Sequence, residues 1–378
     1  MSNDPRKKIV ISAINLTDAG PLSILRDCLN YASKELSGAY DIVALVCDKS
    51  LMGFDNIEYL EFPGSKRSWL ARLYYEYVYF KDLSKKLKPH VWFSLHDVTP
   101  NVESEIRAVY CHNPGPFYNF SFREISMDYK VVFFNLFYMF FYMLNIRKND
   151  FVVVQQDWLR KKFARLYRPE KIIVSHPSVD SAVFAGKPHE NKERGKKYTF
   201  FYPVFPRVFK NMEVICEAAG ILAAEGISDF EICLTIDGKE NRYSRYIYGR
   251  YKALPNIKFL GWLTRETVYD YYQKTDCLVF PSKLETWGMP ITEFKHFSKP
   301  MLLADLEYSH ETIGRYDKVK FFDPDDPAEL ARFMKGAIKD NLIFDAARGE
   351  DVAAPFASSW KELFDMLLSK KGPAGCTQ

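Results

Sequence analysis

Short runs of β-branched and aromatic residues alternate with amphipathic stretches, and this alternation restricts the fold more than any other feature of the chain. The runs KIVISAINL (8–16), YDIVALVCD (40–48) and HVWFSLHD (90–97) are typical of buried strands. Stretches with helical spacing, over 21–36 and 68–87, lie between them. Strands and helices in alternation predict a parallel sheet covered on both faces, which is the α/β doubly wound class.

The same alternation starts a second time after a polar stretch. Residues 178–197, SVDSAVFAGKPHENKERGKK, have no apolar periodicity and predict a linker. A chain of 378 residues is also too long for one core, because single cores stop growing at about 250 to 300 residues. We therefore predict two Rossmann-like domains, 1–177 and 198–355, followed by a C-terminal helix and tail over 356–378. Such domains are expected to face each other across a cleft, with ligands at the carboxyl ends of the strands.

Composition excludes some classes of function. The formal net charge of +4 is too small to indicate a nucleic-acid partner. Seven cysteines without a C-x-x-C pair are typical of a reducing compartment, so we expect a cytoplasmic protein. The first strand is not followed by G-x-G-x-x-G, which argues against a nicotinamide enzyme.

The aromatic content of 16% is high, and much of it gathers in VVFFNLFYMFFYMLNI (131–146). The basic stretch WLRKKFARLYRPEK (158–171) follows, with Arg160, Lys161 and Lys162. Aromatic surface beside basic charge is typical of a protein that binds an anionic membrane from one side. Packing of this helix into the core explains the pattern equally well.

Two acids surround a Gly/Pro turn in ETWGMPITE, where Glu285 comes before the turn and Glu293 follows it. Pro290 suits the start of a helix, and the amides of Gly288 and Met289 would then point at a ligand held at its N-terminus. A carboxylate can accept two vicinal hydroxyls of a sugar or a ribose. The alternative is that Glu293 complements the helix dipole and Glu285 is a surface acid.

Other candidate residues also follow predicted strands. Arg207 and Lys210 come after the strand 197–204, where a diphosphate could meet them, although surface cations ahead of a helix give the same pattern. His112 follows a strand in RAVYCHN, and His96 is its weaker rival. The D-x-D in DPDDP (323–327) is interpreted as a Pro-rich turn, and we expect no metal there.

The ordered set RVFKN, FLGWL, VFPS and ETWGMPITE resembles the second domain of retaining GT-B glycosyltransferases of family four, whose signature is two Glu separated by seven residues. The resemblance covers about 200 to 340 well and the first domain more loosely. It implies that Glu293 holds the ribose of a sugar nucleotide and Glu285 the sugar. It implies further that Arg207 and Lys210 bind the diphosphate and that the backbone near Gly261 and Trp262 borders the base.

The resemblance also implies a role for two residues of the first domain. His112 would be the catalytic histidine, and Gly20 would lie in the loop that approaches the diphosphate, although the usual second glycine is missing there. The C-terminal helix would cross back to the first domain, as is typical of the family.

The predicted function is transfer of a sugar, without a cofactor or metal, from a nucleoside-diphosphate sugar to a glycan or lipid-linked acceptor in surface polysaccharide synthesis. The protein would be cytoplasmic or peripheral on the inner face of the membrane. Two alternatives stay open at this point. One is a sugar-nucleotide epimerase or phosphorylase of the same fold, and the other is a non-catalytic protein that binds sugar nucleotides.

Overall fold

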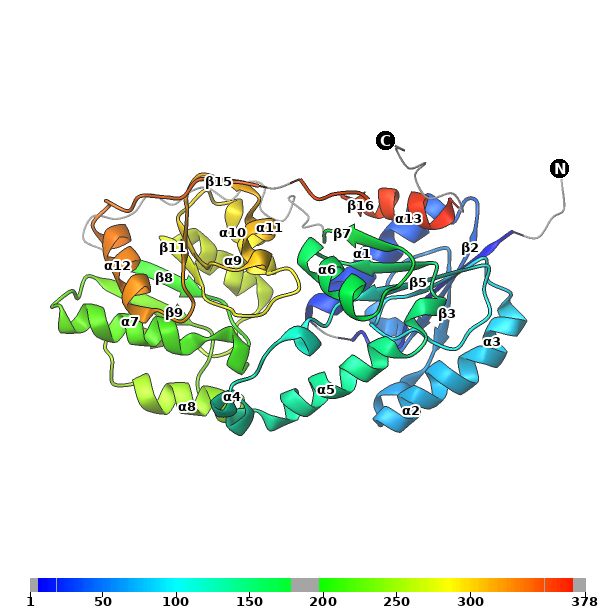
Figure 1. Cartoon of the computed structure of the whole chain (residues 1–378), viewed down its shortest axis with the longest axis horizontal. Helices are drawn as coiled ribbons and strands as arrows, with labels where there is room; N and C mark the ends of the chain where they lie inside the picture. Colours follow the sequence, from blue (N-terminus) through cyan, green and yellow to red (C-terminus); the bar gives the residue numbers. More distant parts are fainter. Residues whose placement is uncertain (1–5, 18, 178–196, 350, 370–378) are drawn as a thin grey trace. The chain divides into compact units, whose positions relative to one another are not determined.

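The computed structural model describes residues 6–17, 19–177, 197–349 and 351–369. The chain forms two compact units, each built around a parallel sheet (Figure 1). The first unit comprises 1–117, 135–178 and 352–378, and the second comprises 118–134 and 179–351. Of the predicted linker 178–197, all but Lys197 lies outside the described residues.

The sheet of the first unit has the strand order β16-β7-β6-β5-β4-β1-β2-β3, and all neighbouring strands are parallel. The strands are β1 (Lys8–Ala13), β2 (Asp41–Val46), β3 (Ile57–Glu61), β4 (Val91–Ser94), β5 (Ile106–Cys111), β6 (Phe151–Val154), β7 (Ile172–Ser175) and β16 (Phe356–Ala357). The runs 8–16, 40–48 and 90–97 and the strand before His112 form β1, β2, β4 and β5 as predicted, whereas β16 is only two residues long and was not predicted.

Helices cover both faces of this sheet, because successive residues of each strand face opposite sides. They are α1 (Ala19–Tyr31), α2 (Trp69–Tyr74), α3 (Phe80–Leu87), α6 (Asp157–Leu166), α13 (Trp360–Leu368) and the part of α5 (Tyr129–Met143) from residue 135 on, with π-helical turns η1 (Ala32–Leu36) and η4 (Tyr75–Tyr79). Ile9 and Phe93 pack with α1 and α13 in one core cluster. Val10 and Trp92 pack with α3 in a second cluster on the other face.

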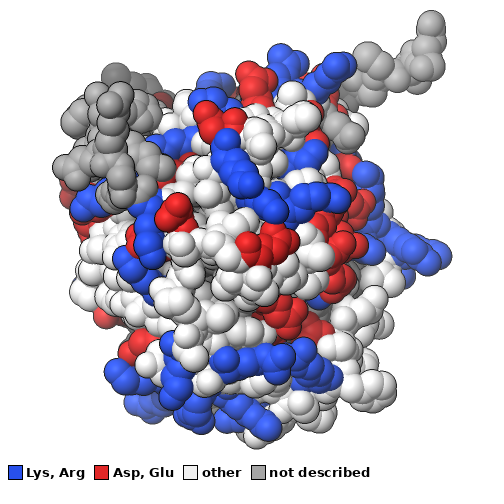
Figure 2. All heavy atoms as spheres, turned by 90° about the vertical axis from the view of Figure 1, so that its left-hand side faces the viewer, with Lys and Arg blue, Asp and Glu red and all other residues white. Residues whose placement is uncertain are grey.

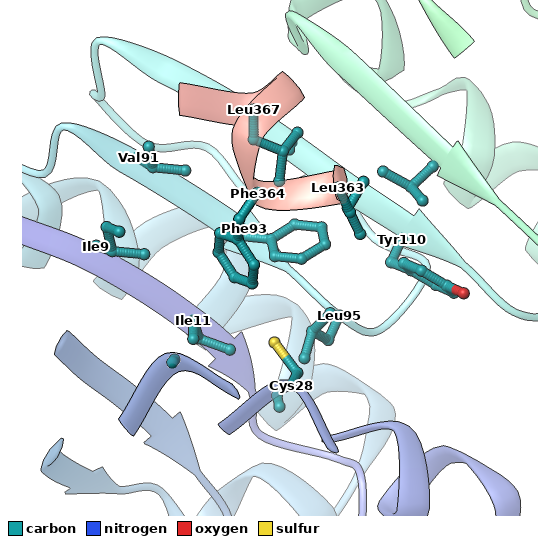
Figure 3. Close-up of a cluster of buried hydrophobic side chains, with 14 of the residues drawn as sticks. Ile9, Ile11, Cys28, Val91, Phe93, Leu95, Tyr110, Leu363, Phe364 and Leu367 are labelled. Atoms are coloured by element: carbon teal, nitrogen blue, oxygen red, sulfur yellow. The ribbon is translucent and has the colours of Figure 1, made fainter. Parts of the chain in front are cut away.

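The C-terminal segment completes the first unit. Phe356 of β16 pairs with Val174 of β7. Phe364 of α13 is fully buried, and its ring centroid lies 5.9 Å from that of Phe93 in an edge-to-face contact (Figure 3). The last strand and helix of the chain therefore belong to the core that its first strand begins.

The sheet of the second unit has the order β10-β9-β8-β11-β12-β14 and is also entirely parallel. Its strands are β8 (Tyr198–Tyr202), β9 (Phe230–Leu234), β10 (Ile257–Phe259), β11 (Cys277–Phe280), β12 (Met301–Ala304) and β14 (Val319–Phe322); β13 (Arg315–Tyr316) and β15 (Ala347–Arg348) form a separate antiparallel pair. Its helices are α4 (Phe122–Met127), α7 (Met212–Ala224), α8 (Arg242–Tyr251), α9 (Arg265–Lys274), α10 (Met289–Lys295), α11 (Glu307–Ile313) and α12 (Pro327–Ile338).

The grouping differs from the predicted division at one stretch. Residues 118–134 were assigned to the first domain, but they group with the second unit. The reason is a set of specific contacts: the rings of Tyr118 and Phe209 lie 6.2 Å apart, and Asp128 forms an ion pair with Arg207 at 3.5 Å.

We predict that Phe364→Ala lowers the free energy of unfolding of the first unit by about 3–5 kcal/mol, because a large cavity is left in a close-packed core. Urea unfolding of the full chain, followed by circular dichroism, measures this change. Lys361→Ala on the same helix is the control, since that side chain forms only an exposed pair with Asp365 and its loss should cost about 0.5 kcal/mol or less. Equal stability of the two variants would contradict the role of α13 in this core.

Candidate functional site

Lys210 and Glu285 form an ion pair at the carboxyl edge of the second sheet. Lys210 comes from the loop after β8, and Glu285 comes from the loop after β11. The two strands are parallel neighbours, with Leu278 opposite Phe201, so both loops leave the sheet at the same edge. The side chains are 19% and 13% exposed, which leaves the pair open to solvent on one side.

Hydrogen bonds fix the backbone of both loops. The Tyr202 hydroxyl donates to the Lys210 carbonyl at 3.0 Å, and the Lys283 amide donates to the Phe209 carbonyl at 2.8 Å. The Tyr308 hydroxyl donates to the Ser282 carbonyl at 2.7 Å. The cation and the acid are thus held in place by the sheet and by each other's loops.

The turn before α10 has the conformation that its glycine permits. Gly288 has a φ of +88°, and a Cβ on it would lie 3.3 Å from Cδ1 of Ile291. The indole N–H of Trp287 donates to Oγ1 of Thr292 at 2.9 Å, which ties the turn to the helix. Met289 is the first residue of α10, so the helix begins one residue before Pro290, the start expected from the sequence.

Glu293 lies in α10, but its carboxylate is held by side chains of α9. Tyr272 donates a hydrogen bond to it at 3.0 Å and Tyr269 at 3.3 Å, and Arg265 pairs with it at 3.4 Å. Burial raises the pKa of Tyr269 to about 12 and that of Tyr272 well above its ordinary value, so both phenols stay protonated donors at neutral pH. The two acids of the motif therefore have different partners: Glu285 has a loop cation, and Glu293 has a set of buried donors.

Arg207 also has an acidic partner. Its guanidinium lies 3.5 Å from the Asp128 carboxylate, which comes from the end of α4, and 5.2 Å from the ring centroid of Phe205. Arg207 is 40% exposed, more than Lys210, so its pair is the more weakly held of the two. Asp128 was not recognised from the sequence, because its contact depends on the path of 118–134.

The remaining predicted residues lie farther from this pair along the sheet or on the other unit. Gly261 follows β10 with a φ of +73°, and Trp262 beside it is 76% exposed. Gly20 lies in the first turn of α1 in the first unit, and a Cβ on it would meet no atom within 4 Å. A side chain larger than hydrogen would therefore fit at Gly20, in contrast to Gly288.

His112 follows β5 in the first unit and is partly exposed. Its Nε2 lies 2.8 Å from the Leu95 carbonyl, which can only accept, so Nε2 carries the proton. Nδ1 lies 3.4 Å from the amide nitrogen of Gln155, and the ring stacks on Tyr110 at a centroid distance of 4.4 Å. Burial lowers the pKa of His112 below its ordinary value even though the nearby Asp97 carboxylate raises it, so the ring is neutral at pH 7.

Asp97 organises the backbone around His112. Its Oδ1 accepts from the amides of His112 and Asn113 and, at 2.9 Å, from the Tyr142 hydroxyl. Asp97 itself has a φ of +70°, a conformation that non-glycine residues rarely adopt. This role could not be predicted from the sequence, where the only signal is an Asp placed after a strand.

His96, the rival of His112, lies in the interior. Its side chain is fully buried, with Nε2 2.7 Å from Oε1 of the equally buried Glu76. Arg72 completes this cluster by donating to the His96 carbonyl at 2.9 Å. His96 therefore does not reach solvent, and His112 is the more accessible of the two rings.

A cavity of about 520 Å³ in the second unit borders the same two loops, since Val208, Asn211 and Lys283 line it. It is bordered by α4, α7 and the start of α12, and its charged lining residues are Arg123, Glu124, Glu213, Glu217, Lys283 and Asp325. Lys210 and Glu285 do not line it. The candidate site is thus defined by its ion pair and loops rather than by this cavity.

Comparison with known proteins identifies one family over the second unit. Residues 185–350 match the family described as glycosyl transferases group 1. The serotype-specific mannosyltransferase WbdA of Escherichia coli is 25% identical over 156 residues, which are 40% of this chain but only 19% of WbdA. The chain therefore matches about a fifth of the length of that relative.

Solved structures show that the fold extends over both units. The lipopolysaccharide outer core galactosyltransferase WaaB has a TM-score of 0.64 at 13% identity, covering 97% of this chain and all of WaaB. HepE of Anabaena, solved with UDP and glucose, has a TM-score of 0.61 at 13% identity, covering 89% of this chain and 90% of HepE. The fold is the GT-B arrangement of two Rossmann-like domains, as predicted.

We predict that Asp97→Asn lowers the pKa of His112 further, because the carboxylate that favours the protonated ring is removed while an acceptor for the two amides is kept. Histidine-selective NMR titration measures the midpoint, which should lie below about 6.5 in the parent protein. Asp82→Asn, on the exposed surface of α3, is the control and should leave the midpoint unchanged. A midpoint that rises in Asp97→Asn would contradict this account.

Proposed function

We propose, from the premise that residues 185–350 belong to the glycosyl transferases group 1 family, that this chain is a retaining glycosyltransferase. It would move a sugar from a nucleoside-diphosphate sugar to a glycan or lipid-linked acceptor. The observation that carries the proposal is the Lys210–Glu285 pair at the carboxyl edge of β8 and β11, because that edge is where doubly wound sheets bind their ligands.

The pair supplies two complementary functions to one ligand. The Lys210 ammonium attracts the diphosphate, and the Glu285 carboxylate accepts hydrogen bonds from sugar hydroxyls. Without ligand, each group neutralises the other in a site that is only partly solvated. A donor that brings both negative phosphates and hydroxyl groups can replace both halves of this contact, whereas a phosphate alone would leave Glu285 without its cation.

The other donor contacts follow the residue order of the motif. We assign the ribose to Glu293. Its carboxylate already accepts hydrogen bonds from Tyr272 and Tyr269 and pairs with Arg265, and its remaining lone pairs would accept hydrogen bonds from the ribose hydroxyls. Arg207 would join Lys210 at the diphosphate by exchanging Asp128 for a phosphate oxygen.

Backbone groups complete the proposed donor site. Gly288 and Met289 would approach the donor through their amides, and Gly261 with Trp262 would border the base. Gly20 of the first unit is assigned to the diphosphate loop. The positive φ of Gly288 and Gly261 supports the close approach of backbone at those two positions.

His112 is the residue of the first unit to which we assign a catalytic role. Its ring is neutral at pH 7, so it would orient the sugar or acceptor through a hydrogen bond rather than carry a positive charge. Nε2–H is directed at the Leu95 carbonyl, and that bond would have to be exchanged when substrate binds.

The proposed reaction breaks the bond between the anomeric carbon and the diphosphate oxygen. Positive charge develops on the sugar ring, and negative charge develops on the leaving diphosphate. Lys210 and Arg207 would stabilise the diphosphate, which then accepts the proton of the acceptor hydroxyl. The acceptor oxygen forms the new bond to the anomeric carbon on the same face that the diphosphate leaves, and we propose that positioning supplies most of the remaining acceleration.

The names of the relatives support a polysaccharide acceptor. WaaB is a galactosyltransferase of the lipopolysaccharide outer core, and WbdA is a serotype-specific mannosyltransferase. We propose surface polysaccharide synthesis as the setting of this chain, with a cytoplasmic location for the catalytic units.

We predict that Lys210→Gln removes the thermal stabilisation of the protein by its sugar nucleotide, because the cation that binds the diphosphate is lost. A thermal-shift panel of UDP, GDP, UDP-glucose and GDP-mannose measures this, since a ligand that binds only the folded state adds about 2.7 kcal/mol at a concentration of 100 Kd. Lys320→Gln is the control, because Lys320 is also 19% exposed and paired with an acid, Asp345. If Lys210→Gln and the parent respond equally to every nucleotide, the proposed donor site is wrong.

We predict a different result for His112→Ala: nucleotide stabilisation is kept, while sugar transfer falls by about 10²- to 10⁴-fold, the usual contribution of a positioned catalytic group. Transfer of labelled sugar from the nucleotide identified in the panel to a lipid-linked glycan extract measures this loss. His310→Ala, on the exposed surface of α11, should transfer at the parent rate. Parent-level transfer by His112→Ala would remove the catalytic assignment but not the donor site.

A further inference from the structure

Helix α5 is apolar on nearly all sides but is covered on only one. Three of its residues are buried, Asn135, Tyr138 and Tyr142, and they form a single stripe at spacings of three and four. The exposed residues of α5 and the turn after it include Tyr129, Phe133, Phe134, Leu136, Phe137, Phe140, Met143 and Leu144. A helix that is hydrophobic all round is normally covered on every side. The exposed side of α5 therefore indicates a surface that binds another molecule or a membrane.

The stretch Tyr129–Lys148 is long and apolar enough to cross a bilayer by length and composition, with a mean hydropathy of 1.3 and 22% of it buried. Its buried stripe, however, is tied to the first unit. The Tyr142 hydroxyl donates to Asp97, and a Cβ on Gly115 would lie 2.0 Å from Oδ1 of Asn135. These contacts hold the buried stripe of α5 against the protein, so the helix lies along the surface with its other apolar residues facing outward.

Helix α2 extends the same apolar surface. The ring of Trp69 stacks on Phe141 of α5 with centroids 5.3 Å apart, and Leu70 and Tyr74 beside it are exposed. In Figure 1, α2 and α5 lie along the same side of the first unit. We call the exposed apolar residues of α2, of α5 and of the turn after α5 the aromatic face. Contiguous apolar surface of this extent is rare on proteins that have no partner.

The segments that carry the aromatic face contain cations only; of the acids that flank α5, Asp128 pairs with Arg207 and Asp150 accepts from the Arg107 amide. The segments 66–74 and 129–148 contain no Asp or Glu. Lys66 and Arg67 come directly before α2, Lys130 lies in α5, and Arg147 and Lys148 follow it, all of them exposed. The basic stretch 158–171 was expected to bind an anionic membrane. Its Arg160 instead pairs with Asp157 and donates to the Ala353 carbonyl at 2.7 Å, so this cation is used within the protein.

The second unit carries a basic helix of its own. Arg242, Arg245 and Arg250 of α8, with Lys252 after it, are exposed, and α8 has no acidic residue. Figure 2 shows Lys and Arg side chains gathered along the lower edge of this unit, where α8 lies. The Arg123 guanidinium of α4 contacts the Tyr246 hydroxyl of α8, and the neighbouring Phe122 is 94% exposed.

We propose that the aromatic face docks on the surface of an anionic lipid bilayer, with α5 in the plane of the interface. Aromatic side chains are favoured at the depth of the headgroups, and each nearby Lys or Arg adds electrostatic attraction to anionic lipid. A second copy of the chain is a poorer occupant, because a twofold contact through this face would bring its own cations together. The inference rests on the exposed residues of α2 and α5 and does not depend on the glycosyltransferase assignment.

Co-sedimentation of the full chain with vesicles of phosphatidylcholine, or of phosphatidylcholine with 30% phosphatidylglycerol by composition, tests the apolar part. Phe137→Gln with Phe140→Gln should weaken binding on the order of a hundredfold, because each ring gains roughly tenfold from burial in lipid. Both rings are more than half exposed, at 62% and 66%, so the fold should be unaffected. Ile343→Gln, at an 81% exposed apolar residue of the second unit, is the control and should bind as the parent does.

The charge contribution is tested separately. Lys130→Gln with Lys148→Gln should weaken binding to the phosphatidylglycerol vesicles on the order of twentyfold and leave the weak binding to phosphatidylcholine unchanged. Lys34→Gln with Lys361→Gln, at exposed cations on the α1 and α13 side of the sheet, is the matched control.

Two results would overturn the proposal. One is vesicle binding by the Phe137→Gln, Phe140→Gln protein at the parent level. The other is a parent protein that does not bind either vesicle but is a dimer by light scattering and becomes monomeric with these two substitutions, since the aromatic face would then be a contact between copies.

Discussion

The parallel pairing of β8 with β11 is the constraint on which the candidate site depends. Lys210 and Glu285, in the loops that follow these strands, are 75 residues apart in the sequence. The parallel register of the strands nevertheless brings both loops to one edge of the sheet. The buried Tyr202 and Tyr308 rings below that edge fix the loop carbonyls. The Lys210 cation and the Glu285 carboxylate meet there because their loops follow two neighbouring parallel strands at the centre of the sheet.

Central strands such as β1, β2, β4, β8 and β11 could be predicted from the sequence because each is a run of mostly buried residues with clear ends, whereas the two-residue strands β13, β15 and β16 carry no such signal. Helices α8, α11 and α12 were missed. The buried side of α8 consists of Tyr243, Ser244, Ile247 and Tyr251, so the apolar periodicity is weak. For α12 a signal was present: Asp326 accepts from the amides of Ala328 and Glu329 and Pro327 follows it, so DPDDP contains a helix cap as well as a turn.

The site was predictable to the extent that it follows strands, and less so where it depends on packing. Lys210 and Glu285 each follow a predicted strand, so both were expected at the carboxyl edge of the sheet, whereas the pairing of β8 with β11 that brings them together was not predicted. The donors around Glu293 could not be foreseen, because they require the angle at which α9 lies against α10. The ion pair between Asp128 and Arg207 could not be predicted either. It forms because residues 118–134 pack with the second unit, and local sequence patterns contain no information on such a long-range grouping.

The return of the chain to its first sheet also bears on how the protein is made. A ribosome makes residues 8–175 before residues 356–367, so the first unit lacks β16, Phe364 and Leu367 while the second unit is being made. By the time residues 356–367 are made, the second unit, complete by residue 351, is free to fold. One face of the first sheet therefore keeps apolar side chains uncovered during synthesis until α13 is made, and such exposed apolar surface favours aggregation.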